Sequence, residues 1–128
     1  MGRLALKHLI DSVIVIDHLN GIESATAFLR DHGPTAALSV VTRAEVLAGC
    51  RDDDADAVQQ LLNAFPALPI TADIADLAAT LRRTQRWKLP DALQAAVAIR
   101  HDLVLVTRNT RDFQAGGTEP AVMVPYRL

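Results

Sequence analysis

The chain has 128 residues, half of them apolar, and a formal net charge of −2, so we expect a single domain over residues 1–128 and do not predict nucleic-acid binding from bulk charge. One cysteine excludes an internal disulfide and is typical of a reducing compartment. Because no apolar stretch is long enough to span a membrane and the N-terminus lacks the pattern of a signal peptide, we expect a cytoplasmic protein.

Predicted strands and helices alternate along the chain. Residues 12–19 are ambiguous, because their β-branched side chains favour a strand whereas Ser12 suits a helix start. Thr42 and Glu45 have the spacing of a capping box and predict a helix from residue 43 to about residue 50. The other expected strands cover residues 4–10, 36–41, 68–70, 103–106 and 121–124, and the other expected helices cover residues 23–31, 57–64, 73–86 and 91–101. This alternation predicts an α/β fold, in which a mostly parallel sheet is covered by helices on both faces.

Four acidic residues stand where predicted strands end or helices begin. Asp11 and Asp112 come just after strands, while Glu45 and Asp91 lie in the first turns of helices. Right-handed crossovers bring such positions to one edge of a parallel sheet. Carboxylates gathered there repel one another unless a hard cation such as Mg²⁺ or Mn²⁺ lies among them. The pattern therefore predicts a metal site that activates water and stabilises charge on a phosphate.

Each acid also has an ordinary structural explanation. Glu45 could simply complete the capping box with Thr42, and the three aspartates could be acids favoured at helix N-termini. Four such coincidences at one sheet edge are less expected than a shared role. The remaining acids, Asp17 among them, are interpreted as surface or capping charges.

Polar and basic side chains flank these acids. Three polar residues could orient the carboxylates or bind a metal-linked water, although they also suit turns: Ser12, Thr107 and Asn109. Three basic residues could bind the phosphates of an RNA: Arg43, Arg108 and Arg111.

Three segments of the chain resemble the acidic motifs of PIN-domain proteins: LIDSVIVID, SVVTRAEVLAGC and LPDALQAAVAIRHDLVLVTRNTRDF. By size and motif order, the chain is most similar to the VapC-type toxins of bacterial type II toxin–antitoxin modules. The resemblance covers residues 9–113 and implies a PIN fold, a five-stranded parallel sheet flanked by helices in which residues 12–19 are helical. It also implies a Mg²⁺- or Mn²⁺-dependent endoribonuclease that forms a homodimer and is inhibited by a VapB-type antitoxin.

The resemblance also assigns roles to individual residues. Asp11, Glu45 and Asp91 match the family's three core acids. The fourth acidic position falls on Asp112, although many relatives place an acid where this chain has Asn109. The expected site therefore consists of four carboxylates that act on RNA as catalytic groups and metal ligands.

Two other functions stay open from the sequence. An aspartyl-phosphate phosphatase would use Asp11 as its nucleophile, but such enzymes commonly carry a second Asp two residues on, where this chain has Val13. A PIN-like interaction module that has lost activity is the other alternative, and the presence of all three core acids argues against it.

Overall fold

The computed structural model describes residues 5–109, 111, 113 and 119–128. The strands are β1 (His8–Ile10), β2 (Ala36–Ser39), β3 (Ala67–Leu68), β4 (Val104–Val106) and β5 (Val122–Met123). The helices are α1 (Ser12–Leu19), α2 (Glu23–His32), α3 (Val40–Gly49), α4 (Ala55–Asn63), α5 (Ala72–Gln85) and α6 (Leu89–Arg100), with short 3₁₀ turns at η1 (Gly33–Thr35) and η2 (Asp52–Asp54).

The five strands form one parallel sheet in the order β3-β2-β1-β4-β5. Leu9 of β1 is in register with Ala37 of β2 on one side and with Leu105 of β4 on the other. The chain first adds strands on the β2 side of β1 and then crosses to the β4 side, so the topological switch point lies between β1 and β4. In sheets of this kind, binding sites form beyond the carboxyl ends of the strands at the switch point.

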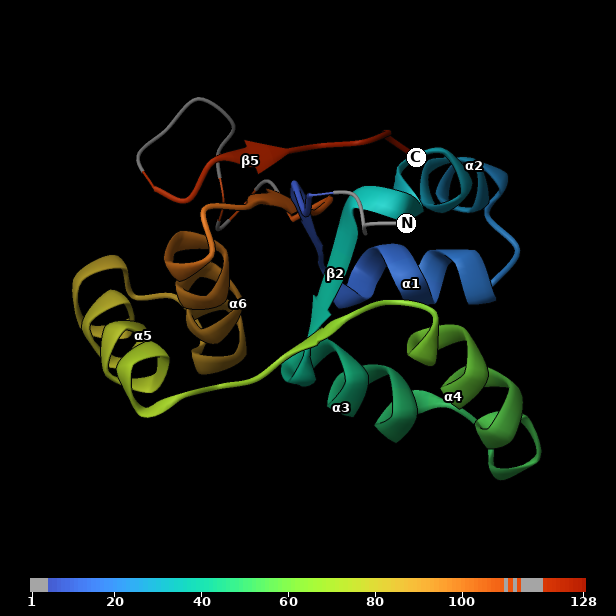
Figure 1. The fold of residues 1–128 in the computed structure, drawn as a ribbon, viewed down its shortest axis with the longest axis horizontal. Helices are drawn as coiled ribbons and strands as arrows, with labels where there is room; N and C mark the ends of the chain where they lie inside the picture. Colours follow the sequence, from blue (N-terminus) through green and yellow to red (C-terminus); the bar gives the residue numbers. More distant parts are fainter. Residues whose placement is uncertain (1–4, 110, 112, 114–118) are drawn as a thin grey trace.

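Helices cover both faces of the sheet, as the sequence predicts (Figure 1). Ile10 and Val106 point to the face that α1, α2, α3 and α4 cover, where they join one buried apolar cluster. Their strand neighbours Leu9 and Leu105 point to the opposite face, where α5 and α6 provide a second cluster rich in alanine. Successive strand residues thus anchor two separate cores, which fixes the sheet register and holds the strand ends in place.

Residues 12–19 form a helix, which resolves the ambiguity of that segment. Asp11 caps the helix, because its carboxylate accepts a hydrogen bond from the backbone N–H of Ser12. Ile14 and Val15 are fully buried against the sheet. Burial of these side chains outweighs their modest preference for strands, since helix propensities are small compared with tertiary packing.

The expected capping box at Thr42 and Glu45 is wrong. The helix begins three residues earlier, at Val40, and Ser39 is its N-cap, with the Ser39 hydroxyl accepting a bond from the backbone N–H of Thr42. The strand expected over residues 36–41 therefore ends at Ser39, because a serine with extended backbone satisfies the free N–H groups of the following helix.

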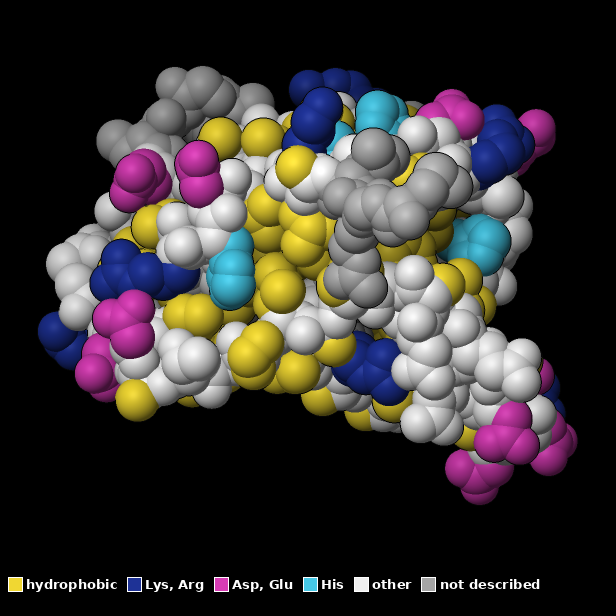
Figure 2. Space-filling model, viewed as in Figure 1, with side chains coloured by type: hydrophobic (Ala, Val, Ile, Leu, Met, Phe, Trp, Pro, Cys, Tyr) yellow, Lys and Arg dark blue, Asp and Glu magenta, His cyan; other side chains and the backbone are white. Residues whose placement is uncertain are grey.

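Charge is unevenly spread over the surface. Figure 2 shows acidic side chains gathered over η2 and the start of α4, where Asp52, Asp53 and Asp54 are exposed, while Lys and Arg side chains are scattered over the same view. In the described part of the chain, no helix is long and apolar enough to cross a membrane.

Candidate active site

The carboxyl ends of three neighbouring strands deliver polar residues to one place. Asp11 follows β1, Ser39 ends β2 and Thr107 follows β4. The backbone N–H of Asp11 donates to the carbonyl of Val106 at 2.9 Å, so the parallel pairing of β1 and β4 continues up to the acid. The switch point between these strands is therefore where the candidate site begins.

The Asp11 carboxylate is buried and held by three donors. Its Oδ1 accepts from the backbone N–H of Ser12 at 2.8 Å and from Nε2 of Gln94 at 3.3 Å, and its Oδ2 accepts from the Thr107 hydroxyl at 2.7 Å. The three donors come from α1, from α6 and from the segment after β4. Bonds of this kind fix the direction of the remaining lone pairs of the carboxylate.

Gln94 is a part of this site that sequence reasoning missed. Its side chain is fully buried, and besides Asp11 its Nε2 donates to the Thr42 hydroxyl, while its Oε1 accepts from the Ser39 hydroxyl at 2.6 Å. The amide thus joins α6 to the carboxyl ends of β1 and β2. A sequence signal existed, because Gln94 interrupts the otherwise apolar run ALQAAVAI and follows Asp91 by three residues.

Glu45 lies close to Asp11, in the second turn of α3 rather than in the expected first turn, because the helix begins at Val40. Desolvation raises the pKa of the Glu45 carboxyl above its ordinary value, and the charge of Asp11 raises it further, whereas a hydrogen bond from Ser12 lowers it. The residue as a whole is exposed, and its carboxyl forms a hydrogen bond with Ser12, the residue that follows Asp11. The structure therefore brings together two of the predicted acids and one predicted supporting residue.

Asp91 reaches the same edge from the other side of the sheet. It is half-buried in the first turn of α6, after Pro90 and the N-cap Lys88. Residues three apart share a face of a helix, so Asp91 stands on the face that carries Gln94, one turn nearer the N-terminus. The contact between Gln94 and Asp11 thus places the Asp91 end of α6 at the carboxyl ends of the strands.

The segment after β4 carries the remaining candidates. The Thr107 hydroxyl, besides holding Asp11, accepts from the backbone N–H of Asn109 at 3.0 Å, so the two predicted supporting residues are joined. The Arg108 guanidinium forms an ion pair with Asp17. Asp112 lies outside the described residues. The other two basic candidates are the half-buried Arg43, on α3, and the exposed Arg111.

The prediction that Asp17 is a surface charge is wrong. Its side chain is buried in α1 and accepts hydrogen bonds from Arg108 and from the Tyr126 hydroxyl. The hydrogen bond from Arg108 is the main reason that the pKa of Asp17 is lowered, and Tyr126 lowers it further, whereas desolvation opposes them. Asp17 looks exposed in the sequence because its partners lie 91 and 109 residues away.

The carboxylates of Asp11 and Glu45 suit a hard cation in kind, because Mg²⁺ and Mn²⁺ prefer carboxylate oxygens as ligands. Desolvation is the main cause of the raised pKa of Glu45, and the charge of Asp11 adds a repulsion that a cation between the two carboxylates would relieve. Among residues 5–109, 111, 113 and 119–128, no three His, Cys, Asp or Glu side chains meet in a group that could hold a metal ion.

The sequence model of the PIN domain family matches residues 9–117. The chain belongs to the PIN domain family. The matched residues include all four predicted acids.

Several known proteins are similar to this PIN domain over most of its length. Ribonuclease VapC19 of Mycobacterium tuberculosis is 35% identical over 113 residues, which cover 82% of this chain and 90% of the relative. Ribonuclease VapC10 of the same organism is 38% identical, with 82% and 84% covered. A solved toxin–antitoxin complex from Klebsiella pneumoniae contains a chain with 35% identity and a TM-score of 0.87, with 95% of this chain and 100% of that chain covered.

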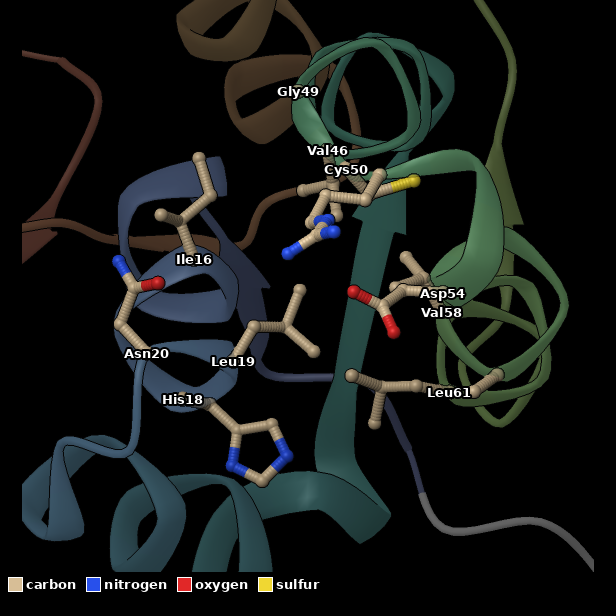
Figure 3. A pocket seen from close by; sticks show the side chains of 12 residues that line it. Ile16, His18, Leu19, Asn20, Val46, Gly49, Cys50, Asp54, Val58 and Leu61 are labelled. Atoms are coloured by element: carbon tan, nitrogen blue, oxygen red, sulfur yellow. The ribbon is translucent and has the colours of Figure 1, made fainter.

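A pocket of about 760 Å³ lies beside the acidic site of this PIN domain, between α1, α3 and α4 (Figure 3). Its lining is largely apolar, with Ile16 and Leu19 from α1, Val46 from α3 and Leu61 from α4. Ile16 and Leu19 are 39% and 43% exposed, although both are large hydrophobic residues. Because Ile16 lies four residues after Ser12 in α1, the pocket begins about 6 Å along the helix from the acidic site.

Proposed function

We propose that this PIN domain is a metal-dependent endoribonuclease and the toxin of a type II toxin–antitoxin system. The observation that carries the proposal is the Asp11 carboxylate, which is buried at the switch point, fixed by three donors and accompanied by Glu45. Two relatives that are 35% and 38% identical bear the name ribonuclease, which favours RNA as the substrate.

The four predicted acids have distinct parts in this proposal. Asp11 and Asp91 would hold the principal ion, with Glu45 beside Asp11 as the third acid and Asp112, outside the described residues, as the fourth. When bound, Mg²⁺ or Mn²⁺ supplies an activated water and offsets charge that builds on the phosphate. Glu45 would be suited to accept a proton from water, since its pKa is raised above that of an ordinary carboxyl.

The polar neighbours keep Asp11 in one orientation. Thr107 donates to one carboxylate oxygen, and Gln94 and the N–H of Ser12 donate to the other. Such outer groups orient ligating carboxylates and affect activity even though they do not touch the substrate. Arg43 and Arg111 are the basic residues that we assign to the phosphates of the RNA.

A VapB-type antitoxin is the proposed partner, because the Klebsiella pneumoniae structure that this chain resembles at 35% identity is a toxin–antitoxin complex. The apolar pocket offers the antitoxin a place to bury side chains, since the exposed Ile16 and Leu19 gain stability when a partner covers them. A partner seated there lies within one helix length of Asp11, close enough for a following segment to cover the acids.

The test is cleavage of total cellular RNA by purified, antitoxin-free protein with Mg²⁺, with Mn²⁺ and with a chelator. We expect discrete fragments that require metal and are lost in Asp91→Asn. The matched control is Asp76→Asn, which changes an exposed aspartate on α5 and leaves cleavage intact. Absence of cleavage and of metal binding by the folded protein would favour an inactive interaction module instead.

A further inference from the structure

Three residues from distant parts of the chain meet beside the candidate active site. The Arg108 guanidinium donates twice to Asp17, from Nε to Oδ2 at 2.6 Å and from Nη2 to Oδ1 at 3.0 Å. The Tyr126 hydroxyl donates to the same Oδ2 at 2.7 Å. The Asp17 side chain is 9% exposed and that of Arg108 28% exposed, so solvent screens this pair less than a surface pair.

The three residues join the two segments on which Asp11 depends. Asp17 lies in α1, whose N-cap is Asp11. Arg108 directly follows Thr107, whose hydroxyl holds Asp11. The backbone N–H of Thr107 donates to the carbonyl of Met123 in β5, and Tyr126 follows Met123 by three residues.

We propose that Asp17, Arg108 and Tyr126 form a clamp that positions the segment after β4, so that the Thr107 hydroxyl stays on the Asp11 carboxylate. All three are positioning residues. Their effect on catalysis rests on the proposed nuclease function, whereas their effect on the order of the segment does not.

The clamp gives Arg108 a different role from the phosphate contact expected from the sequence. Both oxygens of Asp17 are engaged by the guanidinium, which is the bidentate geometry that suits arginine best. The ion pair engages two of the five guanidinium N–H donors and fixes the position of the group on Asp17. Replacement of Arg108 therefore displaces Thr107 and does not weaken the binding of RNA.

Amide hydrogen exchange tests the clamp without reference to catalysis. The reporter is the N–H of Asn109, which donates to the Thr107 hydroxyl, and the reference is the N–H of Leu105, which donates to Ala121 inside the sheet. In Asp17→Asn and in Tyr126→Phe, we expect Asn109 to exchange at least about tenfold faster while Leu105 is unchanged, because local opening is separate from global unfolding.

Two further variants guard against misfolding and surface effects. The double variant Asp17→Asn with Arg108→Gln leaves no unpaired buried charge, so it keeps the test open if a single variant fails to fold. Asp73→Asn is the matched control, because Asp73 pairs with Arg100 at 2.6 Å on the exposed side of α5 and α6. We expect no change at Asn109 in this control.

Cleavage kinetics then separate positioning from RNA binding. For Arg108→Gln and Asp17→Asn, we expect kcat to fall by about 10- to 100-fold, the range for groups that orient a ligand, with KM changed by less than about twofold. The kcat of the double variant should be no lower than that of the less active single variant, since the same interaction is lost in both single variants and in the double variant.

The outcomes decide between the two assignments. Faster exchange at Asn109 alone, with a loss confined to kcat, supports the clamp. Unchanged exchange at Asn109 in every clamp variant overturns it, as does a rise in KM for Arg108→Gln that Asp17→Asn does not share. If wild-type protein cleaves no RNA, the nuclease proposal fails and the exchange result alone decides the clamp.

Discussion

Gln94→Met is the substitution that most directly tests the buried network around Asp11. Methionine matches the length of glutamine and fills the same space, so no cavity is created. It removes three hydrogen bonds: those from Gln94 to Asp11 and to Thr42, and the one that Gln94 accepts from Ser39. The Ser39 hydroxyl is left without its acceptor, and Asp11 loses one of its three donors.

The size of the loss follows from these contacts. A hydrogen bond to a charged group contributes about 1.5–3 kcal/mol and a neutral one about 1 kcal/mol, and at 3.3 Å the bond to Asp11 belongs at the low end. Removal of the buried amide offsets part of the loss, so we expect the free energy of unfolding to fall by about 3 kcal/mol. For a domain of this size, that corresponds to a fall in Tm of about 12 °C.

Urea unfolding followed by circular dichroism measures the change, with an unchanged m value showing that the unfolded state is the same. Gln60→Met serves as the control, because Gln60 is exposed on α4. The rate of RNA cleavage by Gln94→Met should also fall, even at temperatures where the variant is fully folded. A loss of stability below about 1 kcal/mol would refute the reasoning, because the buried amide would then contribute no more than a surface contact.

Three further predictions address the neighbouring charges and the pocket. The hydrogen bond from Arg108 lowers the pKa of Asp17, so the stability that this bond provides is present at neutral pH and lost as pH falls below about 4. Asp17→Asn should lower the free energy of unfolding at pH 7 by about 2 kcal/mol, and urea titrations should show that this free energy then depends less on pH in acid. Because the pKa of Glu45 is raised, its charge destabilises the fold at a pH above that pKa. Glu45→Gln should therefore raise the free energy of unfolding of the metal-free protein at pH 7 by less than about 1 kcal/mol, the limit for an exposed group. In scanning calorimetry, this gain should vanish in acid. Leu19→Asp in the pocket should weaken antitoxin binding at least about tenfold in biolayer interferometry without loss of RNA cleavage, whereas Leu128→Asp, at the exposed C-terminus, should not.

The fold could be predicted from the sequence because its signals are local. Alternating apolar runs and helical patterns predicted the parallel sheet and both helical layers, and the observed sheet confirms them. Helix boundaries were harder, as at Ser39, where the capping serine lies between the apolar strand residues Ala36 to Leu38 and the apolar, β-branched Val40 and Val41 that begin the helix. The side chains of these valines suit either structure, so the turn was not visible in the pattern.

The candidate site was predictable only in part. Asp11 comes just after a strand and Glu45 lies in the helix that follows the next strand, so the two acids were expected to be near each other and are. Gln94 and Asp17 were missed because their importance comes from partners 83 and 91 residues away, and no local pattern encodes such contacts. Polar residues that interrupt an apolar helix face are the signal that could have found Gln94.

The central claim is that this protein cleaves RNA by metal-assisted attack of water. It is tested most directly with a defined RNA that the protein cuts and the same RNA carrying a 2′-deoxy sugar at the cleaved position. Attack by water does not need the 2′-hydroxyl, so we expect both substrates to be cut in the presence of Mg²⁺ or Mn²⁺, with 5′-phosphate and 3′-hydroxyl ends. Failure to cut the deoxy substrate, with 2′,3′-cyclic phosphate ends on the ordinary RNA, would contradict the account.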